Sequence, residues 1–179
     1  SSFNYPTSTT AFQTANAGGR DIIVTHLTQD GSNIIGSTYI GGNNDDGFNW
    51  INTNYGDNFR GEIVLDNTGN AYIASFSSSS NFPVTPGSYQ SNHTGSQDGV
   101  ICKLNPTLST LEWATYLGSS GDDAAYGLRL DNNNNVYVTG AASSGFPTTA
   151  NGAIPNHIGG NLDGFIAKLS PQGNNLFAS

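Results

Sequence analysis

The chain has 179 residues, of which only 10% are charged, and its formal net charge is −8. Its five lysines and arginines form no cluster in the sequence, which argues against nucleic acid and anionic membrane surfaces as partners. No apolar run approaches the roughly 20 residues that a membrane-spanning helix needs. The abundance of glycine, asparagine, serine and threonine predicts short strands joined by tight turns, and therefore an all-β protein.

The first predicted segment, residues 1–46, begins with loop sequence and continues with two strands within residues 20–40. It ends on the nine letters TYIGGNNDD (residues 38–46), and nearly the same letters, TYLGSSGDD, return at residues 115–123. Self-similarity at a fixed spacing is typical of a repeat architecture, so this recurrence predicts a chain built of repeated units.

The two longer segments, residues 60–123 and 124–179, repeat one another at a distance of 65 residues. Asp66 in LDNTGNAYIA corresponds to Asp131 in LDNNNNVYVT, and the aspartates of QDGVICKL and LDGFIAKL have the same spacing. Each segment contains four strand-like runs separated by turn sequences. Four-stranded units of this length predict the blades of a β-propeller, because a β-sandwich has no reason to repeat its sequence.

These recurring motifs resemble the SBBP β-propeller repeat, a family of long exported and cell-surface bacterial proteins. The pattern TYLG…DD…YGLRLD…NVYVTGA…FP…DGFIAKLSPQGN extends over nearly the whole chain, with departures in the insertion at 47–59 and at Asn135, where the turn usually carries Gly-Asn. The resemblance implies a propeller fold and an extracellular or cell-surface location, and it implies no catalytic residue.

One propeller domain with about two and a half blades of about 65 residues is therefore expected. Because a propeller closes with roughly four to eight blades, we expect the chain to be part of a larger protein whose other domains are its partners. The predicted organisation is the second half of a first blade with its link (1–46), an insertion (47–59), a second blade (60–123) and a third blade ending within its last strand (124–179).

The insertion, GFNWINTNYGDNF, combines aromatic rings with amide and carboxylate side chains. It lies with the other long connections, which are expected to crowd one face of the propeller, the usual place for function. Rings can stack on the C–H faces of sugars while amides bind hydroxyl groups. Alternatively, the rings pack under the loop or against a neighbouring blade. The candidate ligand-binding residues are Trp50, Tyr55, Phe48, Phe59, Asp57 and Asn52.

Two pairs of adjacent aspartates, one in each link between blades, are candidate metal ligands. Carboxylate oxygens are what Ca²⁺ prefers, although no EF-hand spacing is present. The alternative is that each aspartate caps a turn by accepting backbone N–H bonds, and recurrence in every link favours this structural role. The candidates are Asp45, Asp46, Asp122 and Asp123.

The sequence favours a noncatalytic scaffold or binding module that contacts protein or polysaccharide through its long-loop face. Two alternatives are a propeller-type enzyme acting on glycans and a structural spacer in a long surface protein. A glycosidase needs a dedicated pair of carboxylates. Nothing in the sequence distinguishes one pair from the repeating background, so no catalytic residue and no cofactor beyond Ca²⁺ is expected.

Overall fold

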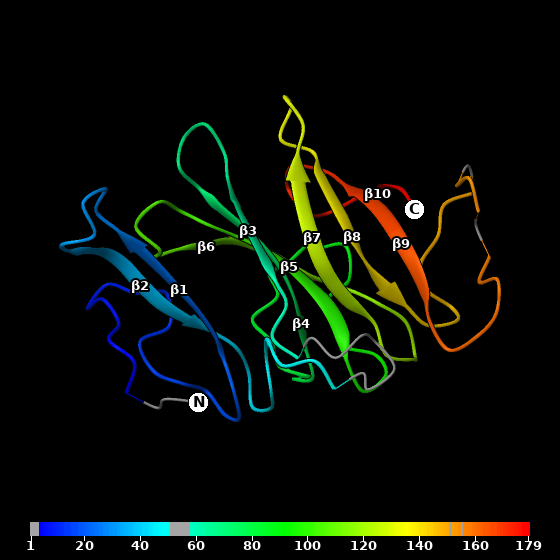
Figure 1. Ribbon diagram of the computed structural model, residues 1–179, viewed down its shortest axis with the longest axis horizontal. Helices are drawn as coiled ribbons and strands as arrows, with labels where there is room; N and C mark the ends of the chain where they lie inside the picture. The colour runs from blue at the N-terminus through cyan, green and yellow to red at the C-terminus, as the bar shows by residue number, and fades with distance from the viewer. Residues whose placement is uncertain (1–3, 51–57, 151, 155) are drawn as a thin grey trace.

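The computed structural model describes residues 4–50, 58–150, 152–154 and 156–179, and the regular structure in these ranges consists of β-strands. The strands form three antiparallel sheets that lie side by side (Figure 1). The prediction of an all-β fold built from antiparallel propeller blades is confirmed. The strands are β1 (Ile22–Leu27), β2 (Ile34–Ile40), β3 (Glu62–Leu65), β4 (Ala71–Ser77), β5 (Asp98–Leu104), β6 (Leu111–Leu117), β7 (Ala124–Leu130), β8 (Val136–Ala142), β9 (Asp163–Leu169) and β10 (Leu176–Ala178).

We call the sheets blade 1 (β1 and β2), blade 2 (β3 to β6) and blade 3 (β7 to β10). In blades 2 and 3 each strand pairs with the next one in the sequence, so each blade is a simple meander. β1 and β2 correspond to the third and fourth strands of the later blades. Short turns join β3 to β4 and β7 to β8 at one end of the molecule, whereas residues 41–50, which follow β2, lie at the opposite end (Figure 1).

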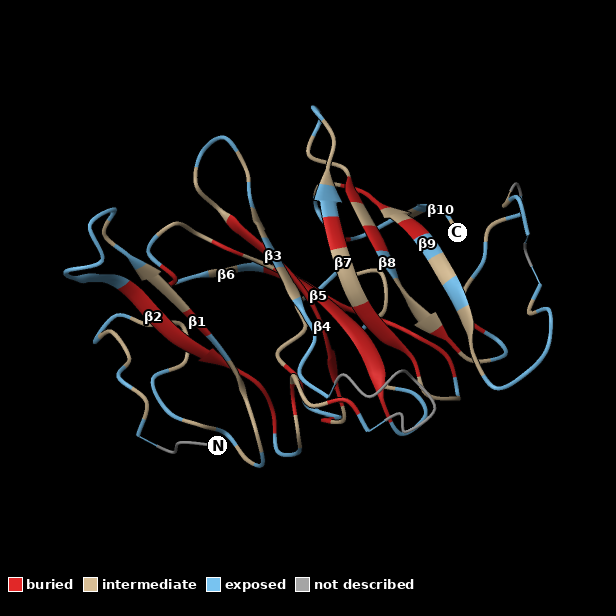
Figure 2. Cartoon of the chain, viewed as in Figure 1, coloured by how far each residue is buried: buried red, intermediate tan, exposed pale blue. Residues whose placement is uncertain are grey.

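The hydrophobic core lies between the blades, because the middle strands of blade 2 carry apolar side chains on both faces. In β5, Val100 and Cys102 pack towards blade 1, and Ile101, which alternates with them, packs towards blade 3. This alternation is the two-residue period of a strand, with both sides covered. Buried residues accordingly concentrate in blade 2 and in the strands that face it (Figure 2).

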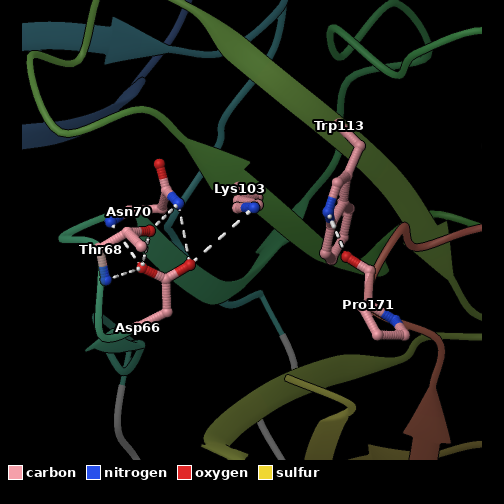
Figure 3. A network of polar contacts seen from close by, with 6 residues as sticks. All are labelled: Asp66, Thr68, Asn70, Lys103, Trp113 and Pro171. Atoms are coloured by element: carbon pink, nitrogen blue, oxygen red, sulfur yellow. Dashed lines mark hydrogen bonds and ion pairs between the residues drawn. The ribbon is translucent and has the colours of Figure 1, made fainter. Parts of the chain in front are cut away.

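The turn between the first and second strands of blades 2 and 3 is built on an aspartate. Asp66 accepts hydrogen bonds from the backbone N–H groups of Thr68 and Asn70 at 2.9 and 3.0 Å, and Lys103 lies 3.9 Å from its carboxylate (Figure 3). Burial alone would raise the pKa of Asp66, but the hydrogen bonds from Asn70 and Thr68 outweigh it and lower the pKa to about 2. Asp131 accepts equivalent backbone bonds, so the repeated aspartate is structural.

A hydrogen bond to a proline carbonyl joins neighbouring blades near the short turns. The indole N–H of Trp113 in β6 donates to the carbonyl oxygen of Pro171 over 2.9 Å (Figure 3). One blade earlier, Nδ1 of His26 lies 2.8 Å from the carbonyl oxygen of Pro106, the equivalent position. In successive blades the equivalent proline carbonyl is thus contacted by different types of side chain, a tryptophan and a histidine. The sequence repeat does not reveal this recurring contact.

Gly173, in the turn between β9 and β10, is expected to be far less tolerant of alanine than Gly31. Both glycines have positive φ, 65° and 70°, so either substitution costs about 1–2 kcal/mol of backbone strain. A Cβ at Gly31 meets nothing, whereas at Gly173 it runs into the ring of Trp113, which adds about 1–3 kcal/mol of overpacking. Urea unfolding of the two variants measures the difference, and equal losses would contradict the contact with Trp113.

Candidate binding surface

Three aromatic rings meet at the base of the insertion, between β2 and β3. The ring of Phe48 packs edge-on against those of Trp50 and Phe59, with centroids 4.8 and 5.2 Å apart. The guanidinium of Arg20 lies 4.1 Å from the centroid of the Phe48 ring, a cation–π contact. Trp50 and Phe59 nevertheless keep 56% and 72% of their surface exposed, so two rings are presented to solvent.

Buried amide side chains hold this cluster in place. The side-chain amide of Asn49 donates to the hydroxyl of Tyr126 over 3.1 Å and its oxygen accepts from Gln97 Nε2 over 3.0 Å. Oε1 of Gln97 accepts the backbone N–H of Trp50 at 2.9 Å, and the N–H of Asn49 donates to the carbonyl of Asn58 at 2.9 Å. The two ends of the insertion are therefore joined to each other and anchored to blades 2 and 3.

Of the six residues predicted to bind a ligand, the structure brings together Phe48, Trp50 and Phe59. Tyr55, Asp57 and Asn52 lie outside the described residues, and their role stays a prediction. The sequence analysis does not predict Arg20 or Gln97, and it places Asn49 in the insertion without selecting it as a site residue. No local signal marks Arg20 or Gln97, because each reaches the cluster from a distant segment of the chain; Asn49 is inside the insertion but serves as a buried anchor.

The second aspartate of each candidate calcium pair is buried and hydrogen-bonded. Asp46 accepts bonds from the N–H of Gly42 at 2.7 Å and the hydroxyl of Ser79 at 2.9 Å. Asp123 accepts bonds from the N–H groups of Ser119 at 2.6 Å and Ser143 at 2.8 Å. Each carboxylate thus ties the link between two blades to the loop that follows the second strand of the next blade.

The first aspartates of the two pairs are placed differently. Asp45 forms an ion pair with Arg20 over 3.0 Å and accepts the backbone N–H of the same residue at 2.8 Å. Asp122 takes part in a parallel backbone bridge with Gln97. Within the described ranges, no three Asp, Glu, His or Cys side chains gather in a metal-binding group. Binding of Ca²⁺ at these aspartates stays a prediction.

Each of these buried aspartates has a second carboxylate beside it. Asp98, the first residue of β5, faces Asp123 across Gly118, where an added Cβ would meet both carboxylates. Burial, and secondarily the charge of Asp123, raises the pKa of Asp98 to about 7. Asp21 and Asp46 form the equivalent pair one blade earlier, and burial raises the pKa of Asp46 to about 6.

Residues 112–147 match the family model SBBP, which is described as a β-propeller repeat. The match begins in β6, crosses the link that contains Asp122 and Asp123, and ends just after β8. The resemblance to the SBBP repeat is confirmed by this match. No curated protein matches the chain. The described residues include no helix long and apolar enough to cross a membrane.

Proposed function

We propose that this chain is a noncatalytic module of an exported or cell-surface bacterial protein and that it binds neutral polysaccharide through the aromatic cluster Phe48, Trp50 and Phe59. The exposure of Trp50 and Phe59, 56% and 72%, carries the proposal, because anchored rings left in solvent are what sugar stacking requires. The SBBP repeat is typical of secreted bacterial proteins, which supports the location.

The net charge of the chain limits the class of polysaccharide, and the recurrence of its carboxylate pairs argues against a glycan-cleaving enzyme. The net charge of −8 disfavours acidic polymers, so the ligand class is neutral polysaccharide. The close carboxylate pair of Asp98 and Asp123 recurs as Asp21 and Asp46 in the preceding blade. A catalytic pair is needed once in a molecule, whereas a scaffold feature repeats, and this favours a binding module over a glycan-cleaving enzyme.

The double variant Trp50→Ala, Phe59→Ala is expected to lose affinity for neutral polysaccharide by at least about tenfold. Each stacked ring contributes on the order of 1 kcal/mol, and about 1.4 kcal/mol corresponds to a factor of ten. The measurement is retardation in native gels that contain laminarin, mannan, xylan or dextran. The thermal unfolding temperature should change little, because both rings are exposed.

Phe177→Ala is the matched control, since Phe177 is another exposed ring (53%) but lies in β10, outside the cluster. It should be retarded like the unmodified chain. If the unmodified chain migrates freely through all four polysaccharides, the proposed ligand class is wrong, and protein contact or a spacer role replaces it. A large fall in unfolding temperature for the double variant would show instead that the rings are packing residues.

A further inference from the structure

The third strand of the repeat has two neighbouring strands in blades 2 and 3 but only one among the described strands in blade 1. β5 pairs with β4 on one side and β6 on the other, and β9 pairs with β8 and β10. β1, which occupies the same position in blade 1, pairs only with β2 among the described strands. Its other edge therefore presents backbone N–H and C=O groups that an added strand can pair with.

The first strand of blade 2 exposes to solvent a position that the preceding blade buries in blade 3. Leu128 in β7 is 1% exposed because β4 of the preceding blade packs over it. Two residues of β4, Tyr72 and Ala74, belong to the same core cluster as Leu128. Ile63 occupies the same repeat position in β3, and it is 53% exposed. The strand that would cover Ile63 is the second strand of blade 1, the same strand that would pair with the free edge of β1.

A groove of about 590 Å³ lies at this place. One side is β1 from Ile22 to Thr25, and the other is Ile63 of β3 with residues 73–75 of β4. Arg20, Phe59 and Arg60 line the same groove together with Asp21, Asp46 and Glu62, so charges of both signs surround it.

We propose that the free edge of β1 and this groove bind an extended, uncharged peptide strand with the sequence pattern of β4 and β8, supplied by another repeat of the same kind. Both of these strands, AYIASFS and VYVTGAA, lack charged residues and place a tyrosine second. In blade 3, Val136 pairs with Leu169 and Val138 with Ala167. The equivalent partners in β1 are Leu27 and Thr25, which defines the register of the bound strand.

The test is a fluorescein-labelled peptide with the sequence of residues 135–143, NVYVTGAAS, titrated into the 179-residue chain while fluorescence anisotropy is recorded. Saturable binding is expected. Ile63→Asp should weaken it at least tenfold, because the tyrosine of the peptide would face this residue. Ile166→Asp is the matched control: Ile166 is also exposed (70%) but lies on β9, so this variant should bind like the unmodified chain. A peptide in which aspartate replaces the tyrosine should not bind.

Amide hydrogen exchange supplies a second measurement. Strand pairing protects backbone amides of β1, whereas adhesion of the peptide to apolar surface does not. The proposal is overturned if the peptide does not bind, if Ile63→Asp binds it as well as the control, or if the β1 amides gain no protection. Polysaccharide binding is measured with a different ligand. Phe59 belongs to both the aromatic cluster and the groove, whereas Trp50 does not line the groove, so an effect of Trp50 on polysaccharide binding is independent of the peptide result.

Discussion

Replacing Ile101 with alanine is expected to lower the free energy of unfolding by about 2–5 kcal/mol, whereas Ile166→Ala should change it by less than about 0.5 kcal/mol. The two isoleucines occupy the same position of the repeat, 65 residues apart, in β5 and β9. Ile101 is 0% exposed, in the core between blades 2 and 3, and Ile166 is 70% exposed. The difference in cost therefore measures what the neighbouring blade contributes.

Chemical denaturation of both variants, monitored by tryptophan fluorescence, gives the two free energies. The substitution is identical in the two variants, so differences in intrinsic strand preference largely cancel. Similar losses at both positions would contradict the packing of blade 3 against β5. A large loss at Ile166 alone would show that the face of blade 3 that carries Ile166 is covered in solution, for instance by a second copy of the chain.

Lowering the pH from about 7 to about 4 is expected to stabilise the protein. Burial raises the pKa of Asp98 to about 7, well above the usual value of 3.8 in the unfolded chain. Between these two values the folded state binds a proton that the unfolded state does not, so the free energy of unfolding falls as the pH rises. One pKa unit corresponds to about 1.4 kcal/mol, so we expect a stabilisation of a few kcal/mol, shared between Asp98 and the neighbouring Asp123, whose pKa burial also raises.

Asp98→Asn should make this pH dependence less steep, because an amide cannot take up the proton. Part of the slope should remain, since burial also raises the pKa of Asp46 to about 6. Asp30→Asn is the control: Asp30 is exposed, and hydrogen bonds from Thr28 and Ser32 lower its pKa to about 2, outside the window. The Asp30→Asn substitution changes the net charge by the same amount, but it should leave the dependence of the free energy of unfolding on pH unchanged between pH 4 and 7. The measurement is urea unfolding at several pH values, and an equal slope in the Asp98→Asn variant would refute the assignment to Asp98.

The departure from the usual Gly-Asn turn lies at Asn134, one position before the Asn135 that the sequence predicts. Asn135 corresponds to Asn70, and its backbone N–H donates to Asp131 as that of Asn70 donates to Asp66. The glycine position, Gly69 with φ 85°, is occupied by Asn134 with φ 59°. Asparagine tolerates this left-handed conformation better than other side chains, so the turn forms without the glycine.

The candidate site was predictable only in part. The residues Phe48, Trp50 and Phe59 stood out because aromatic rings cluster in a segment that interrupts the repeat. Their exposure could not be read from the sequence, since the same rings in the same loop are equally compatible with packing under it. The anchoring of the aromatic cluster depends on Gln97, which lies at the end of the loop between β4 and β5 and donates to Asn49. The two residues are far apart in the sequence.

The repeat, the strands and the turns could be predicted from the amino-acid sequence, because strand alternation and turn chemistry are local and recur in every unit. Which of two equivalent residues is buried depends on tertiary packing. Ile101 and Ile166, or Leu128 and Ile63, have the same place in the repeat and opposite exposure. The reason is physical: a blade buries its faces only against its neighbours, so burial depends on what lies beside a blade and not on the letters within it.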